Sequence, residues 1–173
     1  MTGGFAPPFP ATYTVNPRLY DIATNAPFYR GILDTFSDAK CQTLAQTFVT
    51  NQTWQVPTLI RLRTQNFSTA LEYRTDPNLQ YVDRARRVQW EQMAKEFENT
   101  ALVPEAAAQT LREFYALELQ VTRQLKQRGV KMLAGSDSAP IAIWTIPGFS
   151  LHQEFRELAA AGLTPLEILQ MTT

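Results

Sequence analysis

The sequence predicts a helix-rich α/β fold, and two stretches lead to this class. Val130–Ala134 is a short apolar run that enters a turn at Gly135–Asp137, as a buried strand ending in a carboxylate does. Trp54–Ile60 reads as a second strand, in which Pro57 marks a bulge or the strand end. Because α/β barrels carry their chemistry at the carboxyl ends of strands, Asp137 is a candidate functional residue. The alternative is a structural turn, since Gly-Ser-Asp-Ser is ordinary turn sequence.

The first part of the chain differs in composition from the rest. Residues 1–36 contain five prolines with aromatic residues between them. That many prolines disfavour a long helix and a central strand. We therefore expect residues 1–36 to form an arm that orders on contact or a loop region near substrate. Residues 37–173 are expected to hold the strand–helix units.

Helical patterns are interrupted by one irregular stretch. Ser37 is a suitable N-cap for a helix that runs to about Asn51. Residues 61–80 are predicted to be irregular, with a turn at Asp76–Asn78. The pattern over Tyr81–Phe97 then predicts a further helix.

Three more helices are predicted towards the carboxyl end. One runs from Pro104 to Arg128, with Gly129 at the position that commonly follows a helix. Capping boxes at Ser150–Gln153 and Thr164–Glu167 each begin another. The sequence stops inside the last of these without a stop signal, so we expect it to end within a larger fold.

Composition excludes several classes of function. Sixteen acidic and sixteen basic residues give no net charge, which argues against a general nucleic-acid binder. No apolar run of 18 residues is present, so no membrane span is expected, and no secretory signal is visible at the amino terminus. The single cysteine, Cys41, excludes an internal disulfide and leaves the compartment open.

A family resemblance covers the last 45 residues, Gly129–Thr173. The matching motifs are the run into Gly135-Ser136-Asp137, Pro147-Gly148, Leu151–Glu154, Leu158–Glu167 and Met171–Thr173. They resemble the carboxyl end of metal-dependent amidohydrolases, in particular the imidazolonepropionase-like and prolidase-like branch. Trp54–Leu59 is a weaker match to the strand before it. The resemblance implies the last two strand–helix units of a (β/α)8 TIM-type barrel, incomplete as given, since a whole barrel takes about 250 residues.

The same resemblance implies a reaction and a set of site residues. Asp137 would be the carboxylate at the end of the eighth strand, which ligates the metal or takes the proton from the attacking water. His152 and Ser138 would contact the substrate, a small-molecule amide or dipeptide. In such enzymes a divalent ion, with zinc the first choice, makes hydroxide available at neutral pH. The carboxylate then passes a proton to the leaving nitrogen.

The sequence also departs from that family. Its members build the metal site mainly from histidines, including a His-x-His pair, whereas this chain has one histidine, His152. A zinc site needs three or four protein ligands. We therefore expect no stable metal on this chain alone and no activity unless another chain completes the site. An N-terminal-turn histidine with a backbone partner is the alternative for His152.

Two hypotheses of function follow. The first is a fragment of a metal-dependent hydrolase of C–N bonds that is inactive alone. The second is a non-enzymatic module, derived from an amidohydrolase, that serves assembly. Unpaired strand edges invite pairing between chains, so a homo-oligomer is expected.

Overall fold

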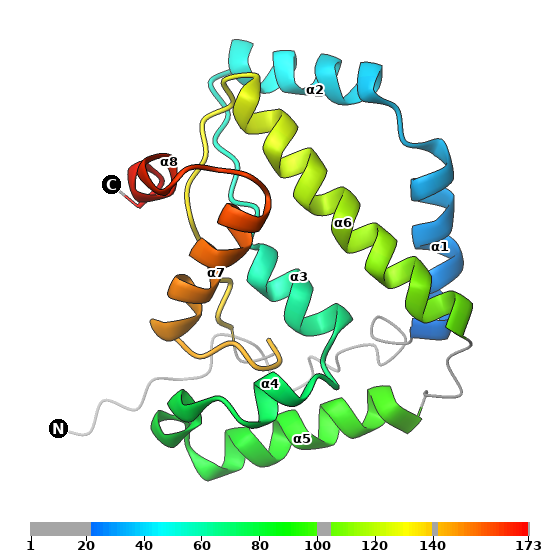
Figure 1. The fold of residues 1–173 in the computed structure, drawn as a ribbon, viewed down its shortest axis with the longest axis vertical. Helices are drawn as coiled ribbons and strands as arrows, with labels where there is room; N and C mark the ends of the chain where they lie inside the picture. The colour runs from blue at the N-terminus through cyan, green and yellow to red at the C-terminus, as the bar shows by residue number, and fades with distance from the viewer. Residues whose placement is uncertain (1–21, 100–104, 140–141, 173) are drawn as a thin grey trace, which may run out of the picture.

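The structure is a computed structural model that describes residues 22–99, 105–139 and 142–172 (Figure 1). These residues are mostly helical. The elements in chain order are α1 (Ile22–Thr35), α2 (Asp38–Thr50), α3 (Leu59–Asn66), α4 (Leu71–Arg74), the 3-10 helix η2 (Pro77–Tyr81), α5 (Arg84–Asn99), α6 (Glu105–Gln127), α7 (Phe149–Ala160) and α8 (Pro165–Gln170). None of the helices in these ranges is long and apolar enough to cross a membrane.

The long helix α6 organises the fold. It packs against α1 and α2 on one side and against α3 and α7 on the other (Figure 1). Its sequence is rich in Ala, Leu, Glu, Gln and Arg, which are strong helix formers. Gly129 takes a φ of +81° just beyond its end, a conformation that favours glycine. The predicted helix and its stop are thus confirmed.

A helix forms in the second half of the proline-rich segment, although its prolines disfavour a long one. Residues 22–35 form α1, which contains Pro27. Two contacts hold α1 on α6: the ring of Tyr29 stacks on Phe114 at 4.3 Å, and Arg30 pairs with Glu113 at 2.5 Å. This packing stabilises the helix in spite of the hydrogen bond that proline removes. Residues 1–21 lie outside the described ranges.

The predicted α/β barrel portion is also wrong. The described residues form no strand, and the two stretches predicted as strands meet in one parallel bridge, Gln55 to Met132. The Gln55 N–H donates to the Lys131 carbonyl and the Leu133 N–H to the Gln55 carbonyl, each at 2.9 Å. A parallel sheet needs further strands and cover on both faces. Within the described ranges no third extended segment supplies them.

We call the two bridged segments, residues 53–57 and 130–134, the ribbon. Its first segment ends early because α3 begins at Leu59, inside the predicted strand Trp54–Ile60. Helix α3 then continues into residues 61–80, which were predicted to be irregular. Side chains alternate along each segment. Val130 and Met132 lie buried in the main core, whereas Trp54, Val56 and Leu133 are exposed.

Two apolar cores stabilise the helices. The main one joins α2, α6, α7, α8 and the ribbon, and includes Cys41 and Leu158. A smaller one gathers Tyr73, Trp90 and Trp144. The Trp90 indole donates to the Ala142 carbonyl at 2.9 Å, and the Trp144 indole donates to the Ser68 carbonyl at 2.8 Å. These bonds satisfy both ring N–H groups.

The two predicted capping boxes fare differently. Thr164 and Glu167 form a complete capping box at the start of α8. Ser150 instead lies inside α7, which begins at Phe149. Its hydroxyl accepts from the Ile146 N–H at 2.7 Å and so anchors the loop before the helix.

Glu154 joins α7 to the start of α3. The fully buried carboxylate accepts from the Leu59 N–H at 3.1 Å and from the Ile60 N–H at 2.7 Å. Thr58, the residue before α3, has a φ of +50° and provides no side-chain cap. Glu154 therefore satisfies backbone donors that a helix start leaves unpaired. Burial raises its pKa to about 7, although both N–H bonds oppose this.

We expect Glu154→Gln to lower the free energy of unfolding by about 1–3 kcal/mol, because an amide NH2 would face a buried backbone N–H. Denaturant unfolding measures the loss. Glu105→Gln, at a side chain that is 84% exposed, is the matched control and should stay within about 0.5 kcal/mol of the parent. Equal effects of the two changes would contradict a structural role for Glu154.

Candidate functional site

The ribbon places two turns at one edge of the fold. Because its segments run parallel, Thr58 and Asp137 both follow carboxyl ends. Both have positive φ, +50° and +45°, which is uncommon for residues other than glycine. Gly135 permits the close approach, since a Cβ there would lie 2.6 Å from Val56 Cγ1.

Arg61 lies next to Asp137. It comes from the first turn of α3 and its side chain is only 10% exposed, whereas that of Asp137 is 59% exposed. The Arg61 Nε and Asp137 Oδ2 are 4.0 Å apart. The buried guanidinium thus faces a carboxylate that water reaches freely.

The side-chain carboxylate of Asp137 accepts no hydrogen bond from the backbone of its own turn in the described residues. The Ala139 N–H donates to the main-chain carbonyl of Asp137 at 2.8 Å. No backbone N–H in the described ranges donates to its side chain. On either side, the hydroxyls of Ser136 and Ser138 bond each other at 2.9 Å. Ser138 is the chain neighbour of Asp137, and its hydroxyl is bonded within the turn.

His152 lies in a different place. It is on α7, with its ring edge-on to Phe155 at 5.7 Å. It lines a cavity of about 420 Å³ together with Arg63, Tyr73 and Glu157. Neither Asp137 nor Ser138 lines this cavity, so the structure brings Ser138 to Asp137 and leaves His152 apart.

The polar groups around His152 are largely paired with one another. Arg63 forms ion pairs with Glu72 and with Glu157, the latter at 3.4 Å, and donates to the Tyr73 hydroxyl at 2.7 Å. Tyr115 donates to Glu157 at 2.7 Å. Burial, and then this bond, raise the pKa of Tyr115 above its usual range. We interpret this network as structural, because its charged groups are paired with one another.

The residues present do not fit a metal. Within the described ranges no three His, Cys, Asp or Glu side chains come together as a ligand set. The charged partner of Asp137 is a cation, Arg61, which disfavours a second positive charge. Asp137 alone is therefore not a zinc site.

Sequence patterns did not single out Arg61 and Glu118, and they placed Glu154 only within the motif Leu151–Glu154 at a helix start. Arg61 was expected in an irregular stretch. Glu118 follows Phe114 by four residues and precedes Val121 by three, which is a signal for the apolar face of α6. Glu154 bonds residues about 95 positions away, which no local pattern reveals.

Comparisons with known proteins gave no relatives. No protein-family profile matches the chain, no curated protein is significantly similar to it, and no solved structure resembles it significantly.

We expect the chain by itself to bind no zinc stoichiometrically, because Asp137 has too few companions for a zinc site. Equilibrium dialysis against zinc near neutral pH, with metal analysis, measures this. Asp137→Asn should leave any residual binding unchanged. One tightly bound zinc per chain that is lost in this variant would contradict the expectation.

Proposed function

We propose that this chain contributes the Asp137 carboxylate to a site that hydrolyses C–N bonds, and that further polypeptide completes the site. The observation that carries this is the state of that carboxylate, exposed beside Arg61 and unbonded by the backbone of the described residues. A purely structural turn aspartate would use its oxygens on following N–H groups. The resemblance of Gly135–Asp137 and the residues after it to amidohydrolases suggests the reaction class.

The proposed role of Asp137 is proton transfer. An exposed carboxylate can take a proton from an attacking water and pass it to the leaving nitrogen, a general acid–base role. Arg61 would orient the carboxylate through the 4.0 Å ion pair. The groups that polarise the carbonyl and activate the water must come from elsewhere, because the described residues near Asp137 do not provide them. The chain alone is therefore proposed to be inactive.

The test is to isolate the native polypeptide that carries this sequence and to assay hydrolysis of N-acyl amino acids and dipeptides. Asp137→Asn should lower kcat by about 10²–10⁴-fold, the usual contribution of general acid–base catalysis. Asp34→Asn, at an exposed aspartate on α1, is the matched control and should leave kcat unchanged.

Two outcomes would refute the proposal. One is hydrolysis by the 173-residue chain alone. The other is full activity of the Asp137→Asn polypeptide with an unchanged circular dichroism spectrum. The first would show that no further polypeptide is needed, and the second would place the reacting groups away from Asp137.

A second candidate function is assembly with further copies of this chain. The outer face of the ribbon exposes Trp54, Val56 and Leu133, with Lys131 over the Trp54 ring at 5.5 Å. The backbone N–H and carbonyl of Gln55 both face the second ribbon segment. The backbone groups of Trp54 and Val56 therefore point away from that segment, at the opposite edge of the ribbon. An edge with donors and acceptors can pair with the same edge of a second copy. The zero net charge leaves no long-range repulsion between copies.

We expect the chain to form a concentration-dependent dimer, which sedimentation velocity measures. Leu133→Lys places a charge on the outer ribbon face and should weaken the dimer by about tenfold or more, equal to about 1.4 kcal/mol. Leu166→Lys alters an exposed leucine on α8, outside the two ribbon segments, and is the control. A monomer at every concentration, or equal effects of both variants, would contradict ribbon pairing.

A further inference from the structure

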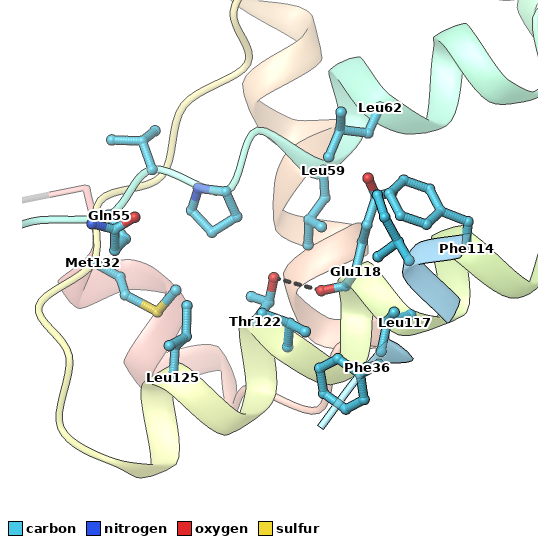
Figure 2. Close-up of a pocket in the computed structure, with 14 residues that line it drawn as sticks. Phe36, Gln55, Leu59, Leu62, Phe114, Leu117, Glu118, Thr122, Leu125 and Met132 are labelled. Carbon is cyan, nitrogen blue, oxygen red and sulfur yellow. Dashed lines mark hydrogen bonds between the residues drawn. The ribbon is translucent and has the colours of Figure 1, made fainter. Parts of the chain in front are cut away.

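An apolar cavity lies between α3, α6 and the ribbon. Its volume is about 390 Å³, within the range of small-molecule sites. Figure 2 shows side chains from these elements converging on it. Its apolar walls include Phe36, Leu59, Leu62, Phe114, Leu117 and Val121.

One carboxylate interrupts this apolar lining. Glu118 lies on α6 between the positions of Phe114 and Thr122 (Figure 2). Its Oε2 is buried and has no hydrogen-bond partner among the described residues. The Thr122 hydroxyl, which is close by, donates instead to the main-chain carbonyl of Glu118 at 2.9 Å. A buried acceptor without a donor is energetically unfavourable, and a ligand that donates a hydrogen bond to this oxygen would remove that cost.

Glu118 also has no counter-charge among the described residues that line the cavity. Every other described residue that lines the cavity is uncharged. Burial raises the pKa of Glu118 to about 7, so about half of it is ionised at neutral pH. The charge of Glu118 also acts on Tyr29 of α1. Burial is the larger cause that raises the pKa of the Tyr29 phenol above 10, and repulsion from Glu118 is the smaller one. Tyr29 therefore stays neutral while Glu118 titrates.

We propose that this cavity binds a small apolar amine, with its ammonium group bonded to Glu118 and its apolar body packed between α3 and α6. A charge-assisted hydrogen bond would satisfy Oε2 and neutralise the carboxylate at once. A neutral apolar ligand would leave the oxygen unpaired. An anionic ligand would place a second negative charge beside the first.

The test uses 4-phenylbutylamine as the probe, with 4-phenylbutan-1-ol and 4-phenylbutanoate as partners of matched shape. We expect isothermal titration of the full chain near pH 8 to show the highest affinity for the amine, a lower affinity for the alcohol and the lowest for the carboxylate. The amine should bind about tenfold or more tightly than the alcohol, as expected for a bond to a charged group. This comparison needs no variant.

Glu118→Gln should reduce the affinity for the amine to about that for the alcohol. Glu105→Gln, at an exposed position at the start of the same helix, is the matched control. It should leave the affinities for the amine and for the alcohol unchanged. Added amine should raise the Tm of the parent chain and not that of Glu118→Gln, which separates loss of binding from loss of folding.

The pH dependence gives a further readout. Between about pH 6 and 8 the ionised fraction of a carboxyl with pKa 7 rises about tenfold, while an alkylammonium stays charged. Amine affinity should rise by about that factor, and alcohol affinity should not. Equal binding of amine and alcohol, no binding of either, or unchanged amine affinity in Glu118→Gln would each overturn the proposal.

Discussion

The carboxylate of Glu154 is the constraint on which the arrangement of the fold depends. It bonds the first two N–H groups of α3 from inside α7, two elements that are far apart in sequence. The chain leaves the ribbon through Thr58 in a left-handed conformation, so α3 begins without a local cap. Because Glu154 fixes that beginning, it also fixes Arg61 one residue later. Arg61 in turn faces Asp137, and the candidate site is thereby built on a buried hydrogen bond rather than on a sheet.

Three carboxylates in the interior show how differently the fold treats buried charge. Glu154 receives two backbone N–H bonds, and Glu157 receives the Tyr115 hydroxyl and the Arg63 guanidinium. Both are thus satisfied within the chain, as buried polar groups usually are. The Oε2 of Glu118 receives no such partner from the described residues. A position that served packing alone would favour an apolar residue, so this contrast is the reason to assign Glu118 a ligand.

The sequence predicted elements that depend on local chemistry and missed those that depend on distant contacts. Helix α6 follows from helical spacing and Gly129, and α8 from the capping box at Thr164. The ribbon segments are short apolar runs, which predict strands, and Gly135 begins the turn after the second run. A strand also needs neighbours, however, and a local run cannot show whether they exist. Helix α1 was missed because its stabilisation comes from α6, which outweighs Pro27.

The same distinction applies to the candidate sites. A turn at Asp137 was predictable from Gly135 and the residues around it. The contact of Asp137 with Arg61 was not predictable, because the two residues are 76 positions apart and neither local sequence indicates the other. His152 was expected beside substrate through the resemblance to a family. In the structure it lies with the Arg63 network instead, where its neighbours pair with one another.

The ribbon connects the two candidate sites through Val56. Val56 lines the Glu118 cavity and is also the side chain that Gly135 must accommodate, two residues before Asp137. Any Cβ at position 135 would press on Val56 and therefore on the cavity wall. Glycine is therefore needed there for the close approach to Val56.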